Sequence, residues 1–282
     1  AIGVSAGDAL TGGNGAVFIG KDAGGAVTTA GGWSGTIIGH QAGTVIVNAE
    51  IVAIGRKAAY QLGGSGYGDT CTIIGTRAGE TLGQTVGAVT LLGHNAGGDL
   101  TVSSGSTFVG VGAGSTGTTG NRNIGVGYYA MSGGVTTGDN NIAIGTSAGD
   151  ALTSGNNNIF MGRNAGGTST TDAYNIIIGH DAGSGTWTGS PSYQNTVVGD
   201  GAMKGAMNGA NYNSAFGTAV LYSVTTGDSN TSLGHGSGYL ISTGVQNTLI
   251  GRNAGDAMST TSNTVLIGMD AGTAINSTDA DG

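Results

Sequence analysis

The sequence predicts an all-β fold, a β-solenoid (β-roll or β-helix) of about 16 coils with a repeat of about 17–18 residues. Three observations predict it. A short apolar strand that ends in glycine recurs along nearly the whole chain, as in NNIAIGTSAG, NNIFMGRNAG and NTLIGRNAG. The spacing between these glycines is nearly constant from one end of the sequence to the other. Two polar residues and Ala-Gly usually follow the glycine. Such a short, regular period is typical of coils that pack only on their neighbours.

The glycine that closes each strand is called the anchor below. Because the anchors span the whole sequence, we expect one elongated domain covering residues 1–282. The 16 anchors are Gly3, Gly20, Gly39, Gly55, Gly75, Gly93, Gly110, Gly127, Gly145, Gly162, Gly179, Gly199, Gly217, Gly234, Gly251 and Gly268.

Each predicted strand has three positions, and alternate residues of a strand point to opposite faces. The flanking positions, one and three residues before the anchor, are rich in β-branched residues, and we expect them to form the inward wall. The middle position, two residues before the anchor, is also apolar in nearly every coil. A continuous apolar stripe in water usually marks an interface. We therefore expect the middle residues to form an inter-chain seam, most naturally in a homotrimer. The seam residues are Phe18, Ile37, Ile73, Leu91, Phe108, Phe160, Ile177, Val197, Leu249 and Leu266.

The turns have a recurring composition as well. Ala usually stands three residues after the anchor and Gly follows it, which suits a sharp turn close to the next coil. From the eighth coil onward an asparagine stands four residues before the anchor, and stacked asparagines can bond along the axis as a ladder. These residues are Asn123, Asn141, Asn158, Asn175, Asn195, Asn213, Asn230 and Asn247.

The three longest gaps between anchors hold both tryptophans, the single proline and several tyrosines. Extra length in a solenoid forms loops that bulge from one face, and exposed aromatic residues on loops often contact a sugar or a partner protein. One alternative is that these rings cover the ends of the thin core. The candidates for receptor contact are Trp33, Tyr60, Tyr67, Trp187 and Tyr193.

Composition excludes several classes of protein. The 282 residues include 61 Gly and 1 Pro, which excludes collagen. The net charge is −8 and the 8 Lys and Arg residues are scattered, so nucleic-acid binding is not expected. The chain has no 18-residue apolar run, so membrane insertion is not expected. The single cysteine, Cys71, is expected to be a buried structural thiol.

No cofactor, metal site or catalytic group is expected. The sequence has neither a GxxxxGK[ST] phosphate loop nor a GxSxG elbow with plausible partners. All four histidines directly follow an anchor, where other coils have Arg, Lys, Thr or Met, and this indicates an exposed corner. They are His40, His94, His180 and His235.

The repeat, often with TTGDNN between units, resembles the glycine-rich NTxxIGxxAG repeats of phage and bacterial tail-fibre-like proteins. It is also similar to the head repeats of trimeric autotransporter adhesins, whose motif is close to NSVAIG. The resemblance covers nearly the whole chain, although the first seven coils lack the asparagine. It implies a homotrimeric shaft or adhesive head on a virion or a cell surface, with a glycan or a protein as receptor.

We therefore predict a non-enzymatic structural fibre. The main alternative is an extracellular filament of copies stacked head to tail, because positions 269–282 at the end and positions 1–3 at the start together make up one repeat. A cut at an arbitrary point explains these ends equally well. An ice-binding solenoid ranks lower, because its aligned threonines are expected on the inward wall. A polysaccharide depolymerase ranks last. The aligned threonines are Thr36, Thr72, Thr90, Thr231 and Thr248.

Overall fold

The computed structural model describes residues 1–10, 15–27, 35–46, 50–62, 70–83, 85–116, 118–187 and 189–275. Within these residues the chain is all-β, a parallel β-solenoid of about 14 turns, and no helix is present. The predicted class, an all-β solenoid, is confirmed, whereas the predicted 16 coils and the homotrimer remain predictions. The chain divides into two compact units, Ala1–Asn140 and Asn141–Gly282, and each is described by itself.

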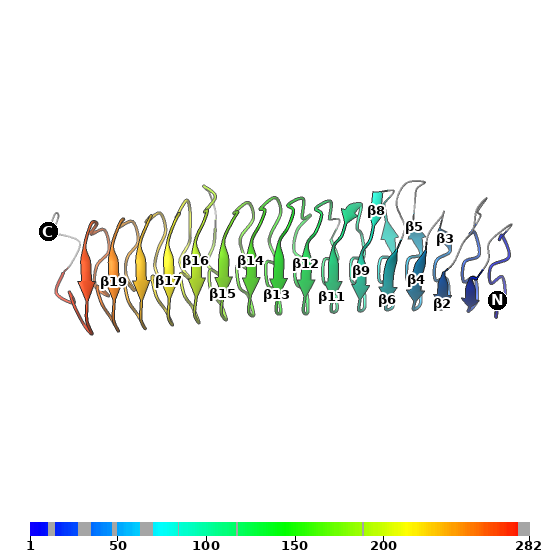
Figure 1. Cartoon of the computed structure of the whole chain (residues 1–282), viewed down its shortest axis with the longest axis horizontal. Helices are drawn as coiled ribbons and strands as arrows, with labels where there is room; N and C mark the ends of the chain where they lie inside the picture. Colours follow the sequence, from blue (N-terminus) through cyan, green and yellow to red (C-terminus); the bar gives the residue numbers. More distant parts are fainter. Residues whose placement is uncertain are drawn as a thin grey trace. The chain divides into compact units, whose positions relative to one another are not determined.

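The first unit contains one main sheet and two short ones (Figure 1). In the main sheet, strands that follow each other along the chain are neighbours, apart from the short strands between them. Its strands are β1 (Val17–Ile19), β2 (Thr36–Ile38), β4 (Ile51–Ile54), β6 (Cys71–Ile74), β9 (Thr90–Leu92), β11 (Thr107–Val109) and β12 (Ile124–Val126). The short sheets are formed by β3 (Val45–Ile46), β5 (Gln61–Leu62) and β7 (Thr81–Leu82), and by β8 (Thr85–Gly87) and β10 (Val102–Ser104).

The second unit contains one strand in each coil, and these strands follow one another from green to red in Figure 1. They are β13 (Ile142–Ile144), β14 (Ile159–Met161), β15 (Ile176–Ile178), β16 (Thr196–Val198), β17 (Ser214–Phe216), β18 (Thr231–Leu233), β19 (Thr248–Ile250) and β20 (Val265–Ile267). Neighbours pair in parallel and in register, so that Phe160 pairs with Ile177 and Met161 with Ile178. Equivalent residues of successive coils therefore form columns along each unit.

The middle strand position forms the core of the single chain. Phe108, Phe160 and Ile177 are 0% exposed, and the flanking residues on either side of them are half-exposed or exposed. The predicted assignment of the two strand faces is therefore inverted, and the predicted inter-chain seam is wrong. Nine seam residues, Phe18, Ile37, Ile73, Leu91, Phe108, Phe160, Ile177, Val197 and Leu249, are buried within one chain, and Leu266 is half-buried.

The reason for this inversion lies on the opposite side of the coil. The seventh residue after the anchor is also apolar and buried in many coils, and it faces the core together with the turn alanines. One such side chain per coil is enough to cover the middle strand residue, because a coil this thin has room for little more. These residues are Val27, Ile46, Leu62, Leu82, Leu100, Leu152, Val224, Ile241 and Met258.

Core volume is balanced between the middle strand position and the fourth residue after the anchor. Where the strand residue is large, the fourth residue is glycine: a Cβ on Gly166 would lie 2.6 Å from Cδ1 of Phe160. In three coils whose strand residue is smaller, a large apolar residue takes that place and is fully buried, despite a positive φ. The latter pairs are Gly125 with Met131, Val197 with Met203, and Ala215 with Leu221.

The anchor must be glycine for two reasons. Gly162 has φ +134°, a conformation that residues with a side chain rarely adopt. A Cβ there would also lie 2.4 Å from the carbonyl oxygen of Gly179, the anchor of the next coil. The anchors thus allow successive coils to approach closely at the end of each strand.

The predicted asparagine ladder is confirmed in the second unit. Asn158, which is 0% exposed, donates from Nδ2 to Oδ1 of Asn141 over 3.0 Å and to the main-chain oxygen of Asp172 over 2.7 Å. Its own Oδ1 accepts from the main-chain N–H of Asn175 over 3.0 Å. The same arrangement recurs up to Asn247. Each asparagine satisfies buried main-chain groups that have no partner in the strand ladder.

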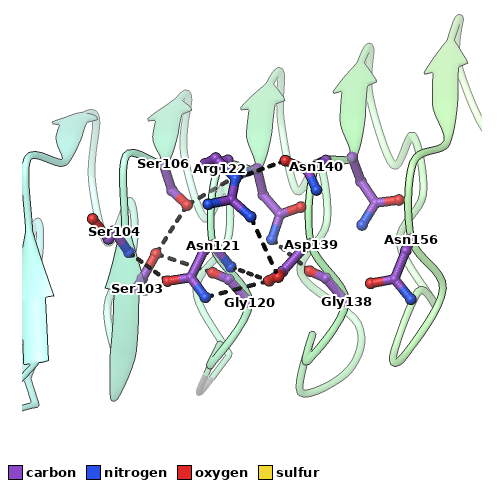
Figure 2. Close-up of polar contacts among 12 residues, drawn as sticks. Ser103, Ser104, Ser106, Gly120, Asn121, Arg122, Gly138, Asp139, Asn140 and Asn156 are labelled. Atoms are coloured by element: carbon purple, nitrogen blue, oxygen red, sulfur yellow. Dashed lines mark hydrogen bonds and ion pairs between the residues drawn. The ribbon is translucent and has the colours of Figure 1, made fainter.

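A second polar row follows the turn that precedes the asparagines, and Figure 2 shows it in the first unit. The main-chain N–H of Ser104 donates to Oδ1 of Asn121 over 2.9 Å, and that of Asn121 donates to Oδ1 of Asp139 over 2.7 Å. Nε of Arg122 donates to Oδ1 of Asn140 over 2.7 Å. Asn and Asp at these turns therefore connect coils as well as forming the turn.

Candidate functional site

The outer face of the main sheet carries a continuous apolar column in each unit. In every coil the residue before the anchor is apolar, and it points away from the core. Charged side chains are absent from both flanking columns in the described strands. The side chains of Leu92, Met161, Phe216 and Leu233 are 39–51% exposed. Such a continuous apolar face is unusual on a protein surface unless something covers it.

The aligned threonines belong to this same outer face. Thr72, Thr90 and Thr231 are exposed, and Thr36 and Thr248 are half-buried. The prediction that these five residues line an inward wall is wrong, for the same reason as the inverted seam. Because these threonines point outward, their position no longer counts against an ice-binding solenoid.

The predicted receptor-contact residues have different environments. Trp187 is only 5% exposed, so the prediction that it contacts a receptor is wrong; its ring fills the core of one of the longer coils. Tyr60 is half-buried, and Nζ of Lys57 lies 4.9 Å from its ring centre. Tyr193 is 39% exposed. Trp33 and Tyr67 lie outside the described residues.

Sequence reasoning missed a pair of tyrosines in the second unit. Tyr222 and Tyr239 both stand five residues after an anchor, on neighbouring coils, and their rings stack with centres 4.8 Å apart at 11°. Tyr239 is 38% exposed. The signal was available, because parallel coils in register bring identical columns together.

Tyr239 lines a hollow of about 440 Å³ on this corner of the second unit. The hollow lies between the column two residues after the anchor and the columns five and six residues after it. The first column contributes Ala219, Gly236 and Asn253, and the others contribute Tyr239, Leu240, Asp256 and Ala257, with His235 at the rim. Because most coils have Asp, Asn or a longer side chain two residues after the anchor, the alanine and the glycine leave this space open.

Two polar side chains line this hollow. Oδ1 of Asp256 is buried and has no hydrogen-bond partner among the described residues, so only the other oxygen of this carboxylate can meet a ligand. Nδ2 of Asn253 donates to Oδ1 of Asp270 over 3.0 Å, so its Oδ1 points the other way, toward Gly236. A Cβ on Gly236 would lie 2.8 Å from that oxygen.

The histidines occupy exposed corners, as predicted, and all four are exposed. Among the described residues, His180 is the one histidine in a charged cluster: its Nδ1 lies 2.6 Å from Oδ1 of Asp200, and its Nε2 contacts Arg163. Beside it, Lys204 donates to Asp181 over 3.0 Å. Partial burial raises the pKa of Asp181, but hydrogen bonds from Lys204 and Asn164 outweigh this and lower it. This is an ion-pair network on a solvated corner.

No group of three or more His, Cys, Asp or Glu residues that could hold a metal ion lies in the part of the chain that the structure describes. A search of the same residues finds no helix with the length and apolarity needed to cross a membrane. No family model, curated protein or solved structure matches the chain. The candidate surfaces are therefore the outer sheet face and the hollow at Tyr239.

Proposed function

We propose that this chain is a non-enzymatic structural fibre protein, the shaft or adhesive head of a tail fibre or surface adhesin. In this proposal it is a homotrimer on a virion or a cell surface and supports attachment to a host or another surface. The single observation that carries the proposal is the outer column directly before the anchors, which is apolar in every coil and is not covered by the rest of the single chain.

The energetics favour association through this face. Full burial of an aliphatic side chain contributes about 1.5–3 kcal/mol. Association costs on the order of 4–15 kcal/mol in lost translational and rotational freedom. The column before the anchor supplies one apolar side chain per coil, so several coils together offset that cost. Closed rotational symmetry then covers the face on every copy.

Mass measurement by light scattering tests the proposal. We expect a particle of three times the chain mass of 27.1 kDa. The variant Met161→Lys with Leu233→Lys places two charges on the outer face at exposed positions, and we expect it to be monomeric and folded. Thr171→Lys with Thr226→Lys, at exposed positions away from the strands, is the matched control and should remain associated.

A monomeric wild-type protein would overturn the fibre proposal. A particle whose mass grows continuously with concentration would instead support the filament of copies stacked head to tail. Electron microscopy of the same samples distinguishes a discrete rod from a growing filament.

One observation favours a second candidate, an ice-binding protein: the aligned threonines face outward rather than inward. Against it, the neighbouring column alternates residues of unequal length, including Met161, Phe216 and Leu233, so the face is uneven in the second unit. Inhibition of ice recrystallisation by the wild type, and its loss in Thr72→Lys with Thr90→Lys, would support this candidate. Recrystallisation at the rate of a buffer control would eliminate it.

A further inference from the structure

The hollow at Tyr239 combines an aromatic ring with acceptor groups. Leu240, which is 47% exposed, and Tyr239 supply apolar surface, and Tyr222 holds the tyrosine ring from behind by stacking. The carboxylate of Asp256, through the oxygen that is not buried, and Oδ1 of Asn253 supply acceptors, and the exposed His235 supplies a further polar group. A volume of about 440 Å³ lies within the range of small-ligand sites.

We propose that this hollow binds one pyranose ring of a neutral polysaccharide. A pyranose has a face of C–H groups, which packs on an aromatic ring, and a rim of hydroxyl groups. Tyrosine suits such a ligand because it offers an apolar ring next to a polar tip. Neighbouring hydroxyls of the sugar would donate to the oxygens of Asp256 and Asn253. The inference rests on the proposed attachment function and names the class of receptor.

Other ligand classes fit the same groups less well. An apolar side chain of a protein partner would cover the remaining carboxylate oxygen of Asp256 without supplying a donor, at a cost of about 1–3 kcal/mol. An anion would be repelled by Asp256 and by the net charge of −8. A divalent cation lacks a second free carboxylate, because Asp270 already accepts from Asn253 and Arg252.

The second unit contains its own comparison site. A hollow of about 330 Å³ lies between the equivalent columns of earlier coils, lined by residues that include Ser147, Asp150, Asn164 and Asp181. It has the same position in the coil and two carboxylates, but its lining contains no aromatic residue. We expect no carbohydrate binding there, because the stacking surface is missing.

The site is open, so a single copy should bind weakly. In a homotrimer three copies would contact one polysaccharide, and linked sites can bind roughly 10²–10⁴-fold more tightly overall. Each single site would then release the sugar readily, while the three sites together would keep the protein attached.

Affinity electrophoresis in gels containing dextran, galactomannan or hydroxyethyl cellulose tests the proposal, with dextran sulfate as the charged comparison. We expect at least one neutral polysaccharide to retard the wild type. Tyr239→Ala and Asp256→Asn should each weaken that retardation at least tenfold in apparent Kd. Tyr212→Ala, which removes an exposed tyrosine elsewhere, and Asp150→Asn, in the comparison hollow, should bind as the wild type does.

Three results would overturn the inference: no retardation by any neutral polysaccharide, retardation by dextran sulfate alone, or unchanged binding in both Tyr239→Ala and Asp256→Asn. The Asn variant keeps the shape of the side chain, so the test remains valid if truncation of Tyr239 disturbs the coil. Thermal unfolding checks each variant. Light scattering on the same samples separates this failure from failure of the fibre proposal, because a trimer that binds no sugar removes only the present inference.

Discussion

Gly166 lies so close to the ring of Phe160 that a methyl group on it would be 2.6 Å from the Cδ1 atom. Its φ of +57° also disfavours a side chain. We expect Gly166→Ala to lower the free energy of unfolding by about 2–4 kcal/mol, from backbone strain together with core overpacking. Urea denaturation followed by circular dichroism measures this.

Gly201→Ala is the matched control for that substitution. Gly201 has φ +60°, but the nearest atom to its added Cβ is 3.8 Å away, on Tyr222. Gly201→Ala should therefore lower the free energy of unfolding only through backbone strain, by about 1 kcal/mol. Equal losses in the two variants would contradict the packing described for Phe160.

The asparagine ladder should contribute strongly to stability at each rung. Asn247 is 1% exposed, donates to Oδ1 of Asn230 over 3.0 Å and to the carbonyl of Thr261 over 2.8 Å, and accepts from the N–H of Thr264. Asn247→Ala removes these partners and leaves buried main-chain groups unsatisfied, at about 1–3 kcal/mol per group. Thermal unfolding measures the loss. Gln246→Ala, one residue earlier and exposed, should change the melting temperature little; a comparable drop there would refute a specific role for the ladder.

Asp172 should make stability depend on pH. Burial raises its pKa above the ordinary value of 3.8, although the N–H of Ser192 and the hydroxyl of Ser169 donate to the carboxyl and oppose the shift. A carboxyl with a raised folded pKa contributes stability that is present below the unfolded pKa and is lost as pH rises through the folded pKa. The ionised group is therefore unfavourable at neutral pH.

The variant Asp172→Asn should remove this pH dependence. We expect its melting temperature relative to the wild type to rise as the pH increases from below 3.8 towards the alkaline range. Asp99→Asn, at an exposed position, controls for the general effect of losing a negative charge. A constant difference between Asp172→Asn and the wild type across that range would show that the buried carboxyl does not titrate as argued.

Cys71 should be protected from reagents while the chain is folded. Its side chain is reduced and 2% exposed, in the core of the first unit. We expect reaction with a chromogenic disulfide reagent only after urea is added, because the thiolate must reach solvent to attack. An added exposed thiol, Thr171→Cys, should react at once in the same buffer. Rapid reaction of the native wild type would show that the coil at β6 opens readily.

Much of this fold follows from the sequence, because each recurring residue type occupies one fixed position in the coil. The anchors, the strands before them and the asparagine ladder were all predictable from the repeat alone. The two strand faces were not, because both are apolar and strand alternation does not say which is inside. Which face is buried depends on the seventh residue after the anchor, such as Leu82 or Leu152, because this residue packs against it. That residue lies outside the strand, so the strand pattern alone does not reveal it.

The hollow at Tyr239 was missed for a related reason. It is formed beside two consecutive small residues, Ala219 and Gly236, and by Tyr239, which stacks on a tyrosine one full repeat earlier in the chain. Such a site is visible only when the coils are stacked and compared column by column. Trp187, which stands out along the chain, is instead buried inside its coil.

In-register stacking also has a genetic consequence. The coil between Gly162 and Gly179 presents to the coils on either side nearly the same hydrogen-bonding groups that they present to it. Duplication or loss of one such repeat would therefore rebuild the same contacts with a different neighbour. Recombination between the repeats of such a gene would therefore change the number of coils one at a time, without requiring a new fold.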